Sequence, residues 1–405
     1  MKARNLMIVQ GGGPTAVLNL TLASILEEAQ SVKVFNKILG ARMGTIGLVH
    51  NDFVEIGSLG RNDLAIMRES PGAILGSSRY GAGDQDIKKI VFELARYGIT
   101  DLLFLGGNGT MLGADRILSE CKRNGYDLRV LGVPKTIDND IVGTDRCPGY
   151  GSAARYIAQS VQELAADVRS LPQPVSILET MGRSVGWIAA SSAIAKRSEQ
   201  EAPHLIYIPE IAFHCDQFID AVDRAVTCNG WAVVVVAEGI RNANGSFVYQ
   251  ISDSAQADGL SRPLTGGVGQ YLAELVSRKL KIRCRCEKPG ILGRTSMLHR
   301  SLQDMEDASL VGRQAVQGLL DERSGEMVAL REISRISTDK FSFMPFCEVA
   351  GKERKIPSHW LKEIKSSIPV CQDFYSYLNP LIGELVKYES CFLSSNYDKK
   401  VIGYE

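Results

Sequence analysis

Two glycine-rich segments each follow a short apolar run directly, and this arrangement constrains the fold more than any other feature of the chain. Asn5–Val9 leads into Gly11–Gly13, and Asp101–Leu105 leads into Gly106–Gly107. In α/β proteins such turns join a buried strand to a helix, because glycine permits the tight backbone turn. Glycine provides 39 of the 405 residues, more than the usual ~7%. These glycines have no collagen-like period and do not lie in serine-rich linkers, so they predict structured turns.

Further apolar runs alternate with helical patterns along the chain. After Gly13, the residues Leu18, Leu22, Ile25 and Leu26 recur at helical spacing. The runs are continuous rather than alternating, which is typical of parallel strands covered on both faces. We therefore predict an α/β fold. Besides the two strands above, the predicted strands are residues 128–133, 175–178, 205–208 and 232–237.

Length and charge limit the class of protein. A chain of 405 residues is long enough for two or three domains, and the last ~60 residues look like an appended helical piece by the usual domain size. Lys+Arg and Asp+Glu number 46 each, which argues against binding nucleic acid or an anionic membrane by bulk charge. No apolar run approaches the ~20 residues of a membrane-spanning helix. The start lacks a signal-peptide pattern and the nine cysteines lack metal spacing, so we expect a cytoplasmic protein with reduced thiols.

The polar segment Lys135–Asp140 follows the strand predicted at 128–133 and contains the densest set of reactive side chains. If Asp138 and Asp140 are partly buried, each raises the pKa of the other, and one of them is a plausible general base. The two glycine loops match neither the dinucleotide-binding GxGxxG motif nor the GxxxxGK[ST] P-loop. Taken singly, each loop could be a tight turn or a helix cap. Together, after two strands of one sheet, they favour a phosphate site.

Four other basic or acidic segments follow apolar runs or lie among small polar residues. Arg183 comes after the strand 175–178, and Glu238 comes after the strand 232–237. An arginine there suits an anion and a carboxylate suits a sugar hydroxyl, although a Glu238–Arg241 surface ion pair is the alternative. Arg79 and Arg294 suit phosphates in the same way. The five histidines are isolated, which makes zinc and serine-hydrolase sites poor interpretations.

The combination of these motifs resembles the phosphofructokinase family. The specific segments are PKTIDNDI at 134–141, the GGNGT loop at 106–110 and MGR at 181–183. QGGGPTAVLN, LGSSRY, TDRCPGYGSAA, VVVVAEGIR and KPGILGRTS follow in the order expected of the family. The resemblance runs from residue 5 to about 320, and VAGKERKIP at 349–357 is similar to the tail of the pyrophosphate-using branch.

The resemblance implies an architecture and an assembly. We expect two doubly wound, mostly parallel-sheet domains with a C-terminal helical extension. The expected donor domain comprises residues 1–149 plus about 292–340, and the expected acceptor domain comprises 150–291. Residues 341–405 are expected to pack on the donor domain. A homodimer or homotetramer is implied, in which a neighbouring subunit completes each site.

The resemblance also implies an activity. A phosphoryl group would pass from pyrophosphate to the 1-hydroxyl of fructose 6-phosphate, giving fructose 1,6-bisphosphate, with Mg²⁺ as cofactor. Asp138 would be the general base. The other implied catalytic residues are Lys135, Thr136, Asp140 and Arg183. The implied donor-binding residues are Gly12, Arg79, Gly107, Asn108, Gly109 and Thr110, of which Asn108 would also be a weak Mg²⁺ ligand. The implied substrate-binding residues are Thr136, Asp138, Met181, Gly182, Arg183, Glu238, Arg285 and Arg294, with Arg285 serving the neighbouring subunit.

The identity of the phosphoryl donor remains open at this point. Lys135 is typical of pyrophosphate users, although some ATP users also have it. Gly109 stands where pyrophosphate users typically carry an aspartate that repels the α-phosphate of ATP, so ATP would have room. Asn108 replaces the metal-binding aspartate of the ATP branch. Three hypotheses follow: a pyrophosphate-dependent phosphofructokinase, an ATP-dependent kinase of the same family, or a non-catalytic regulatory relative.

The acceptor sugar is open as well. Pro174 stands where many members have an arginine for the 6-phosphate, and Ile291 and Gly293 depart from the acceptor-phosphate loop of the family. Arg283 and Lys288 are candidates to compensate. A related sugar or sugar phosphate is the alternative acceptor.

Overall fold

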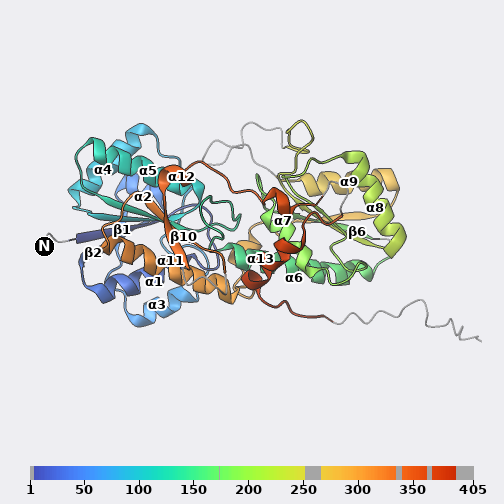
Figure 1. Ribbon diagram of the computed structural model, residues 1–405, viewed down its shortest axis with the longest axis horizontal. Coiled ribbons are helices and arrows are strands. Elements are labelled where there is room, and N and C mark those ends of the chain that lie inside the picture. Colours follow the sequence, from blue (N-terminus) through green and yellow to red (C-terminus); the bar gives the residue numbers. More distant parts are fainter. Residues whose placement is uncertain (1–3, 173, 251–265, 334–339, 363–366, 389–405) are drawn as a thin grey trace, which may run out of the picture.

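The computed structural model describes residues 4–172, 174–250, 266–333, 340–362 and 367–388. The chain forms two α/β lobes that lie side by side (Figure 1). Each lobe is built on its own sheet, as the sequence predicts. All six strands predicted from the apolar runs are present.

The sheet of the first lobe has seven strands in the order β11-β10-β5-β4-β1-β2-β3. The inner strands are parallel, and the edge strands β3 and β11 are antiparallel to their neighbours. The strands are β1 (Arg4–Gln10), β2 (Phe35–Ala41), β3 (Phe53–Glu55), β4 (Asp101–Gly106), β5 (Arg129–Pro134), β10 (Glu326–Leu330) and β11 (Phe341–Pro345).

Both faces of this sheet are covered, which explains its continuous apolar strands. In β1, Leu6 and Ile8 pack into one buried cluster, whereas Met7 and Val9 pack into the other. The first face is covered by α1 (Leu18–Val32), α3 (Arg61–Arg68) and α11 (Leu302–Leu320). The second face is covered by α2 (Thr45–His50), α4 (Asp84–Arg96), α5 (Asn108–Arg123) and α12 (Phe346–Val349).

The second lobe contains a fully parallel sheet of four strands in the order β7-β8-β6-β9. Every residue of the central strand β8 (Ala232–Ala237) is buried. The other strands are β6 (Val175–Thr180), β7 (Leu205–Tyr207) and β9 (Cys284–Glu287). The helices around them are α6 (Tyr150–Arg169), α7 (Trp187–Ser191), the 3₁₀ turn Ser192–Ala195, α8 (Cys215–Asn229) and α9 (Val268–Leu280). A short helix, α10 (Leu292–Thr295), then leads to α11.

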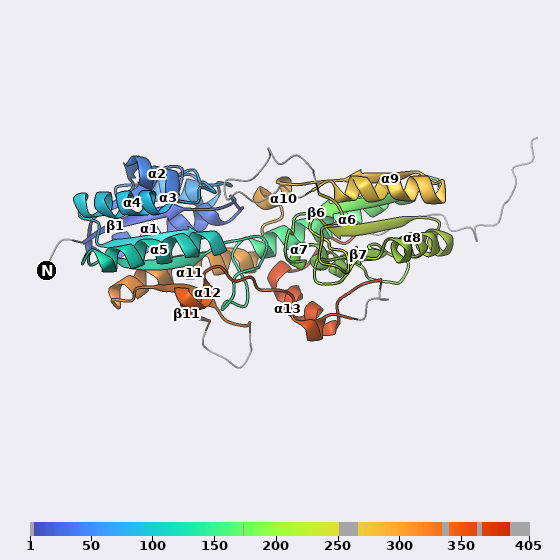
Figure 2. The same cartoon turned by 90° about the horizontal axis from the view of Figure 1, so that it is seen from above.

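The C-terminal segment is divided between the lobes, which corrects the predicted extension. Its first part, β11 and α12, joins the first lobe. After that, Ile356, Val370 and the helix α13 (Gln372–Ile382) pack into the core of the second lobe. Figure 2 shows α13 beside α6 and α7, beneath the second lobe. The expectation for the whole extension came with the family resemblance, whose specific motifs end near residue 320 and do not report the contacts of the later residues. Among the described helices, none has the length and apolarity needed to cross a membrane.

Candidate active site

A cavity of about 200 Å³ opens at the carboxyl ends of β1, β4 and β5. Ligands of open α/β sheets bind at this edge, because the strand-to-helix loops meet there. All six predicted donor residues and four of the five predicted catalytic residues line it. These are Gly12, Arg79, Gly107, Asn108, Gly109, Thr110, Lys135, Thr136, Asp138 and Asp140.

The first glycine loop is packed tightly against its neighbours. A side chain at Gly11 would place its Cβ 2.6 Å from Oγ1 of Thr110, so any other residue there would force Thr110 to shift. The amide of Gly11 donates to the carbonyl of Leu105 (2.7 Å), and that of Gly12 donates to the carbonyl of Ser78 (3.1 Å). Two amides expected to cradle a phosphate therefore bond to the protein itself. Since Gly12 has φ +75°, the loop needs glycine for its turn as well as for close approach.

Lys135 lies beneath this loop and holds it. Its ammonium group donates to the carbonyls of Gly11 (2.8 Å) and Gly13 (2.5 Å), and the residue is 2% exposed. Burial, followed by the nearby guanidinium of Arg294, lowers the pKa of Lys135 to about 7. An ammonium group has three N–H donors, so one remains for a ligand in the cavity. The lysine is therefore placed to contact an anion that rests on the glycine loop.

Asp138 and Asp140 lie on the loop after β5, and both are half-buried. Burial, and next the carboxylate of Glu238, raises the pKa of Asp138, against the opposing effect of Arg79 and Arg294. Burial, and next the charge of Asp138, raises the pKa of Asp140. The loop is held locally, since the amide of Asp138 donates to Oγ1 of Thr136 (3.1 Å). Two carboxylates that share a site in this way can hold or release a proton near neutral pH.

Asn108 is the residue that best fits the expected magnesium ion. Its Nδ2 donates to Oδ2 of Asp140 (2.9 Å), which turns its Oδ1 away from that carboxylate. This Oδ1 is buried and has no hydrogen-bond partner in the described structure. A carbonyl-type oxygen suits Mg²⁺ or one of its waters. The described residues include no group of three or more His, Cys, Asp or Glu that could hold a metal, so a bound Mg²⁺ would take most of its ligands from phosphate oxygens and water.

The predicted acceptor residues lie on two adjoining loops after β6 and β8 of the second lobe. The amide of Gly239 donates to the carbonyl of Gly182 (3.2 Å), which joins the two loops. A Cβ at Gly239 would lie 1.8 Å from the carbonyl oxygen of Arg183, so glycine is required at this contact. The charge of Glu238 raises the pKa of Asp138, so the loop after β8 is close enough to influence the loop 135–140 of the first lobe, called the catalytic loop below for its proposed role. The loops carry Met181, Gly182, Arg183 and Glu238.

The other two arginines predicted to bind the acceptor, Arg285 and Arg294, occupy different places. Arg294 reaches the donor side, since a Cβ at Gly13 would lie 2.8 Å from its Nη1. Arg285 is instead on β9, where it pairs in register with Ser176 at the start of β6 and lies 3.8 Å from Asp167. At ~3.3 Å per residue along a strand, Arg285 is remote from the Met181 end of the sheet. A single chain therefore brings Arg294 to the site and leaves Arg285 outside it.

Sequence reasoning missed several residues of the site. Thr45, Ser78 and Tyr80 also line the cavity. Thr45 could not have been found in the same way, because Arg42 and Met43 separate Gly44 from β2 and that strand is not continuously buried. Lys288, proposed to compensate in acceptor binding, is held by the buried carboxylate of Glu179 at 2.8 Å.

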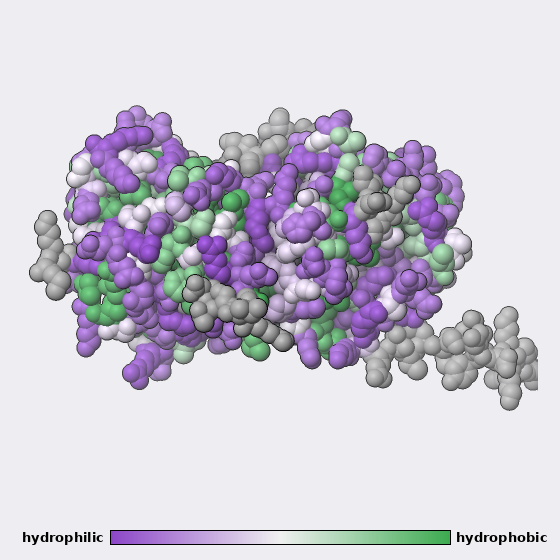
Figure 3. All heavy atoms as spheres, viewed as in Figure 1, coloured by the Kyte–Doolittle hydropathy of each residue, from purple (hydrophilic) through white to green (hydrophobic). Residues whose placement is uncertain are grey.

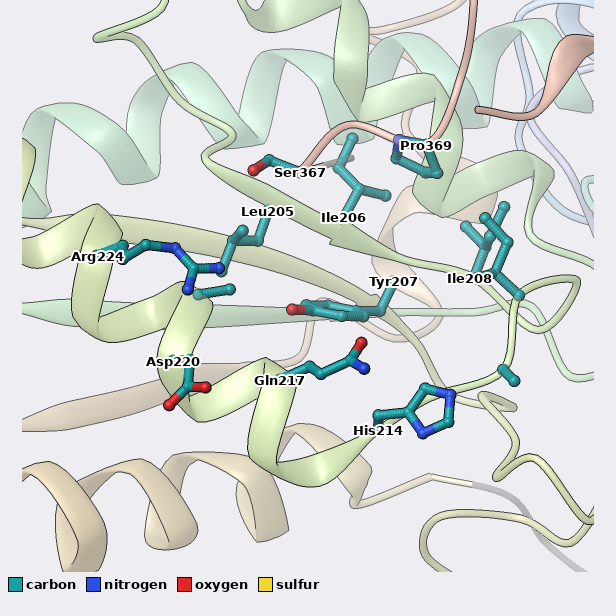
Figure 4. Close-up of a pocket in the computed structure, with 13 residues that line it drawn as sticks. Leu205, Ile206, Tyr207, Ile208, His214, Gln217, Asp220, Arg224, Ser367 and Pro369 are labelled. Atoms are coloured by element: carbon teal, nitrogen blue, oxygen red, sulfur yellow. The ribbon is translucent and has the colours of Figure 1, made fainter. Parts of the chain in front are cut away.

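A separate cavity of about 310 Å³ lies at the β7 edge of the second sheet (Figure 4). It lies between β7, α8 and the segment around Ser367 and Pro369, with Tyr207, Gln217 and Arg224 around it. None of the predicted site residues lines this cavity. The candidate active site is therefore the smaller cavity at the strand ends of the first lobe.

Comparisons with known proteins identify the family of the chain. Residues 5–319 match the family model described as phosphofructokinase. The chain is 34% identical over 390 residues to pyrophosphate–fructose 6-phosphate 1-phosphotransferase of Xanthomonas campestris, covering 93% of this chain and 91% of that one. It is 33% identical over 363 residues to sulfofructose kinase of Alkalicoccus urumqiensis, covering 89% and 92%.

A solved structure is similar as well. The pyrophosphate-dependent phosphofructokinase of Marinobacter aquaeolei aligns with a TM-score of 0.83 at 29% identity, covering 95% of this chain and 92% of that one. The predicted fold class is thereby confirmed. The chain belongs to the phosphofructokinase family and is a phosphotransferase.

Proposed function

We propose that the protein transfers a phosphoryl group from pyrophosphate to the 1-hydroxyl of fructose 6-phosphate. One observation supports this most strongly. The glycine loop on Lys135 and the carboxylate of Asp138 share one cavity, and Glu238 of the acceptor loop is near enough to raise the pKa of Asp138. This arrangement supports a donor site, a base and an acceptor site that meet at one edge. Relatives named for this reaction cover nearly the whole chain.

The proposed roles follow from charge and position. Asp138 takes the proton from the attacking hydroxyl, since its raised pKa suits a base that works near neutral pH. Lys135, Arg79 and Arg294 neutralise charge on the donor and on the transferring group, which is most of what phosphoryl transfer needs from a protein. Thr136 and Asp140 orient the reacting groups. Met181, Gly182, Arg183 and Glu238 hold the sugar.

Magnesium fits this scheme through Asn108. Its unpartnered Oδ1 would contact the ion or a water bound to it, while phosphate oxygens supply the other ligands. The ion would neutralise the donor phosphates when bound.

The decisive experiment is a donor and acceptor screen with the purified full-length protein and Mg²⁺. Pyrophosphate and ATP are each offered with fructose 6-phosphate, and fructose 1,6-bisphosphate is measured by a coupled assay. Turnover with pyrophosphate is expected. Turnover with ATP alone would overturn the proposed donor, and silence with both would favour another acceptor or the regulatory hypothesis.

The role of Asp138 is tested by Asp138→Ser. Loss of a general base should lower kcat by ~10²–10⁴-fold with little change in the KM for the sugar phosphate. Asp52→Ser, at an exposed surface residue, is the control and should retain the wild-type rate. A rate for Asp138→Ser close to that of the control would refute the assignment.

ATP-dependent phosphorylation of a related sugar is a second candidate, favoured by Gly109. This residue is exposed at the start of α5 and lines the donor cavity without a side chain. Gly109→Asp should abolish any turnover with ATP, through charge repulsion, and spare turnover with pyrophosphate. Unchanged ATP turnover in this variant would show that the repulsion argument is wrong.

The acceptor sugar of this second candidate is tested by a separate assay. A relative of similar identity is named sulfofructose kinase, and Pro174 occupies a position where the resemblance leads us to expect an arginine. A sulfonate carries less charge than a phosphate and needs fewer basic contacts. The screen therefore includes 6-sulfofructose with each donor. Preference for it over fructose 6-phosphate would favour the second candidate.

A further inference from the structure

The back of the catalytic loop is held by a segment more than 200 residues later in the chain. Glu353 forms an antiparallel bridge with Ile141. The amide of the next residue, Arg354, donates to the carbonyl of Asp140 at 2.7 Å. The guanidinium of Arg354 also donates, through Nη1, to the carbonyl of Asn139 at 3.2 Å. One arginine thus fixes the peptide units 139–140 and 140–141, which lie between and just after the two aspartates.

The same guanidinium lies against two aromatic rings. It is 4.3 Å from the ring centre of Trp187 and 5.7 Å from that of Tyr377. Nε1 of Trp187 donates to the carbonyl of Arg354 at 3.1 Å. Trp187 is fully buried and opens α7, just after the acceptor loop that carries Arg183. Arginine over an aromatic face is attracted to it by the ring quadrupole, so Arg354 connects the catalytic loop of the first lobe to the acceptor side of the second.

Tyr377 of α13 completes the support. Its hydroxyl accepts from Nδ2 of Asn139 (2.8 Å) and donates to the carbonyl of Asp145 (2.8 Å). Asn139 is fully buried and has φ +55°, a left-handed conformation that costs energy in a residue other than glycine. That conformation determines how Asp138 and Asp140 are presented, and Tyr377 stabilises it.

We propose that Arg354 is a positioning residue, which sets the Asp138–Asp140 loop relative to the acceptor loops of the second lobe. This inference rests on the proposed function, because it assigns Arg354 to the geometry of that reaction. Arg354 acts on the loop backbone and on Trp187. A displacement of ~1 Å in the catalytic loop is enough to lower the rate ~10²-fold.

The test compares Arg354→Met with Arg323→Met. Arg323 also stacks on an aromatic ring, that of Phe343 at 4.4 Å, and pairs with Glu326 at 3.1 Å, but at the opposite end of the first sheet. Arg354→Met should lower kcat ~100-fold while both KM values change less than ~3-fold, as expected for lost orientation. Arg323→Met should keep the wild-type kcat.

Two further readouts separate positioning from general loss of structure. Guanidinium at millimolar concentration should restore part of the kcat of Arg354→Ala and leave Arg323→Ala unchanged. Hydrogen exchange of the peptide 136–147 should become ~10-fold faster in Arg354→Met only, since its amides bond within the held loop. This second readout needs no turnover, so it remains decisive even if the screen finds no donor.

The outcomes are distinct. A wild-type protein that is inactive with every donor and acceptor contradicts the proposed function but leaves the exchange result to judge Arg354. An Arg354→Met variant with kcat within ~3-fold of wild type, or with unchanged exchange in 136–147, overturns the proposal. A fall in kcat that matches the unfolded fraction, without rescue by guanidinium, overturns it as well.

Discussion

At the scale of single residues, the burial of Lys135 predicts how the reaction depends on pH. The pKa of Lys135 is lowered to about 7 by burial and by Arg294, and the pKa of Asp138 is raised, first by burial. The base must be ionised and the lysine protonated. The value of kcat/KM for pyrophosphate should therefore rise as pH increases through the raised pKa of Asp138, then fall above about pH 7.

The bound state should behave differently on the alkaline side. Bound pyrophosphate is an anion and favours the protonated lysine, so the alkaline limb of the kcat profile should lie at higher pH than that of kcat/KM. Pre-steady-state and steady-state rates between pH 5 and 9 measure both limbs. Coincident alkaline limbs would contradict contact between Lys135 and the donor.

Some residues of the candidate site could be identified from the sequence, whereas their long-range contacts could not. Lys135, Asp138 and Asp140 could be found because they follow a strand, and strand ends of a parallel sheet meet at one edge. The sequence does not reveal that Lys135 bonds to the carbonyls of the first glycine loop, because these partners are 122 and 124 residues away in the chain. The role of Arg354 could not be predicted either, because the residues it contacts are also distant in the chain.

At the scale of elements, most strands that sequence reasoning missed are less buried than those it found; β10, buried at four of its five residues, is an exception. The buried strand β8, with its run of valines, was predicted in full. The strands missed include β2 and β9, where exposed and half-buried residues are interspersed, and β11, an antiparallel edge strand that is half-buried throughout. Apolar continuity identifies only strands that are covered on both faces.

A buried ion pair joins the segment after the catalytic loop to α11. Nε and Nη2 of Arg146 bond to the two oxygens of Asp307 at 2.6 and 2.8 Å, and the side chains are 6% and 5% exposed. Asp307→Ala leaves the arginine charge buried without its partner. The free energy of unfolding should fall by about 3–5 kcal/mol.

Urea unfolding followed by fluorescence measures this change. Asp52→Ala breaks the exposed pair with Arg42, whose partners are 48% and 57% exposed, and should cost less than about 1 kcal/mol. Equal effects of the two substitutions would show that the Arg146–Asp307 pair does not stabilise the junction.

At the scale of the whole molecule, the surface around Arg294 suggests a second copy of the chain. On the face in Figure 3, hydrophilic residues predominate and hydrophobic patches are small. Near α10, however, four large apolar side chains are 64–93% exposed. These are Ile291, Leu292, Leu298 and Leu302. Such clusters usually mark an interface, and Arg285 lies outside the site of its own chain, as expected if it serves a neighbour.

Subunit complementation tests whether the site is shared. Arg285→Ala and Asp138→Ser should each be nearly inactive alone. In a mixed dimer, one of the two sites combines an intact Asp138 with an intact Arg285, so random exchange of equal amounts should restore about a quarter of the wild-type activity. The activity is measured after mild denaturation and joint refolding. If the mixture is no more active than the sum of its components, Arg285 does not act in a neighbouring subunit, and its ion pair with Asp167 is the role that the described residues support.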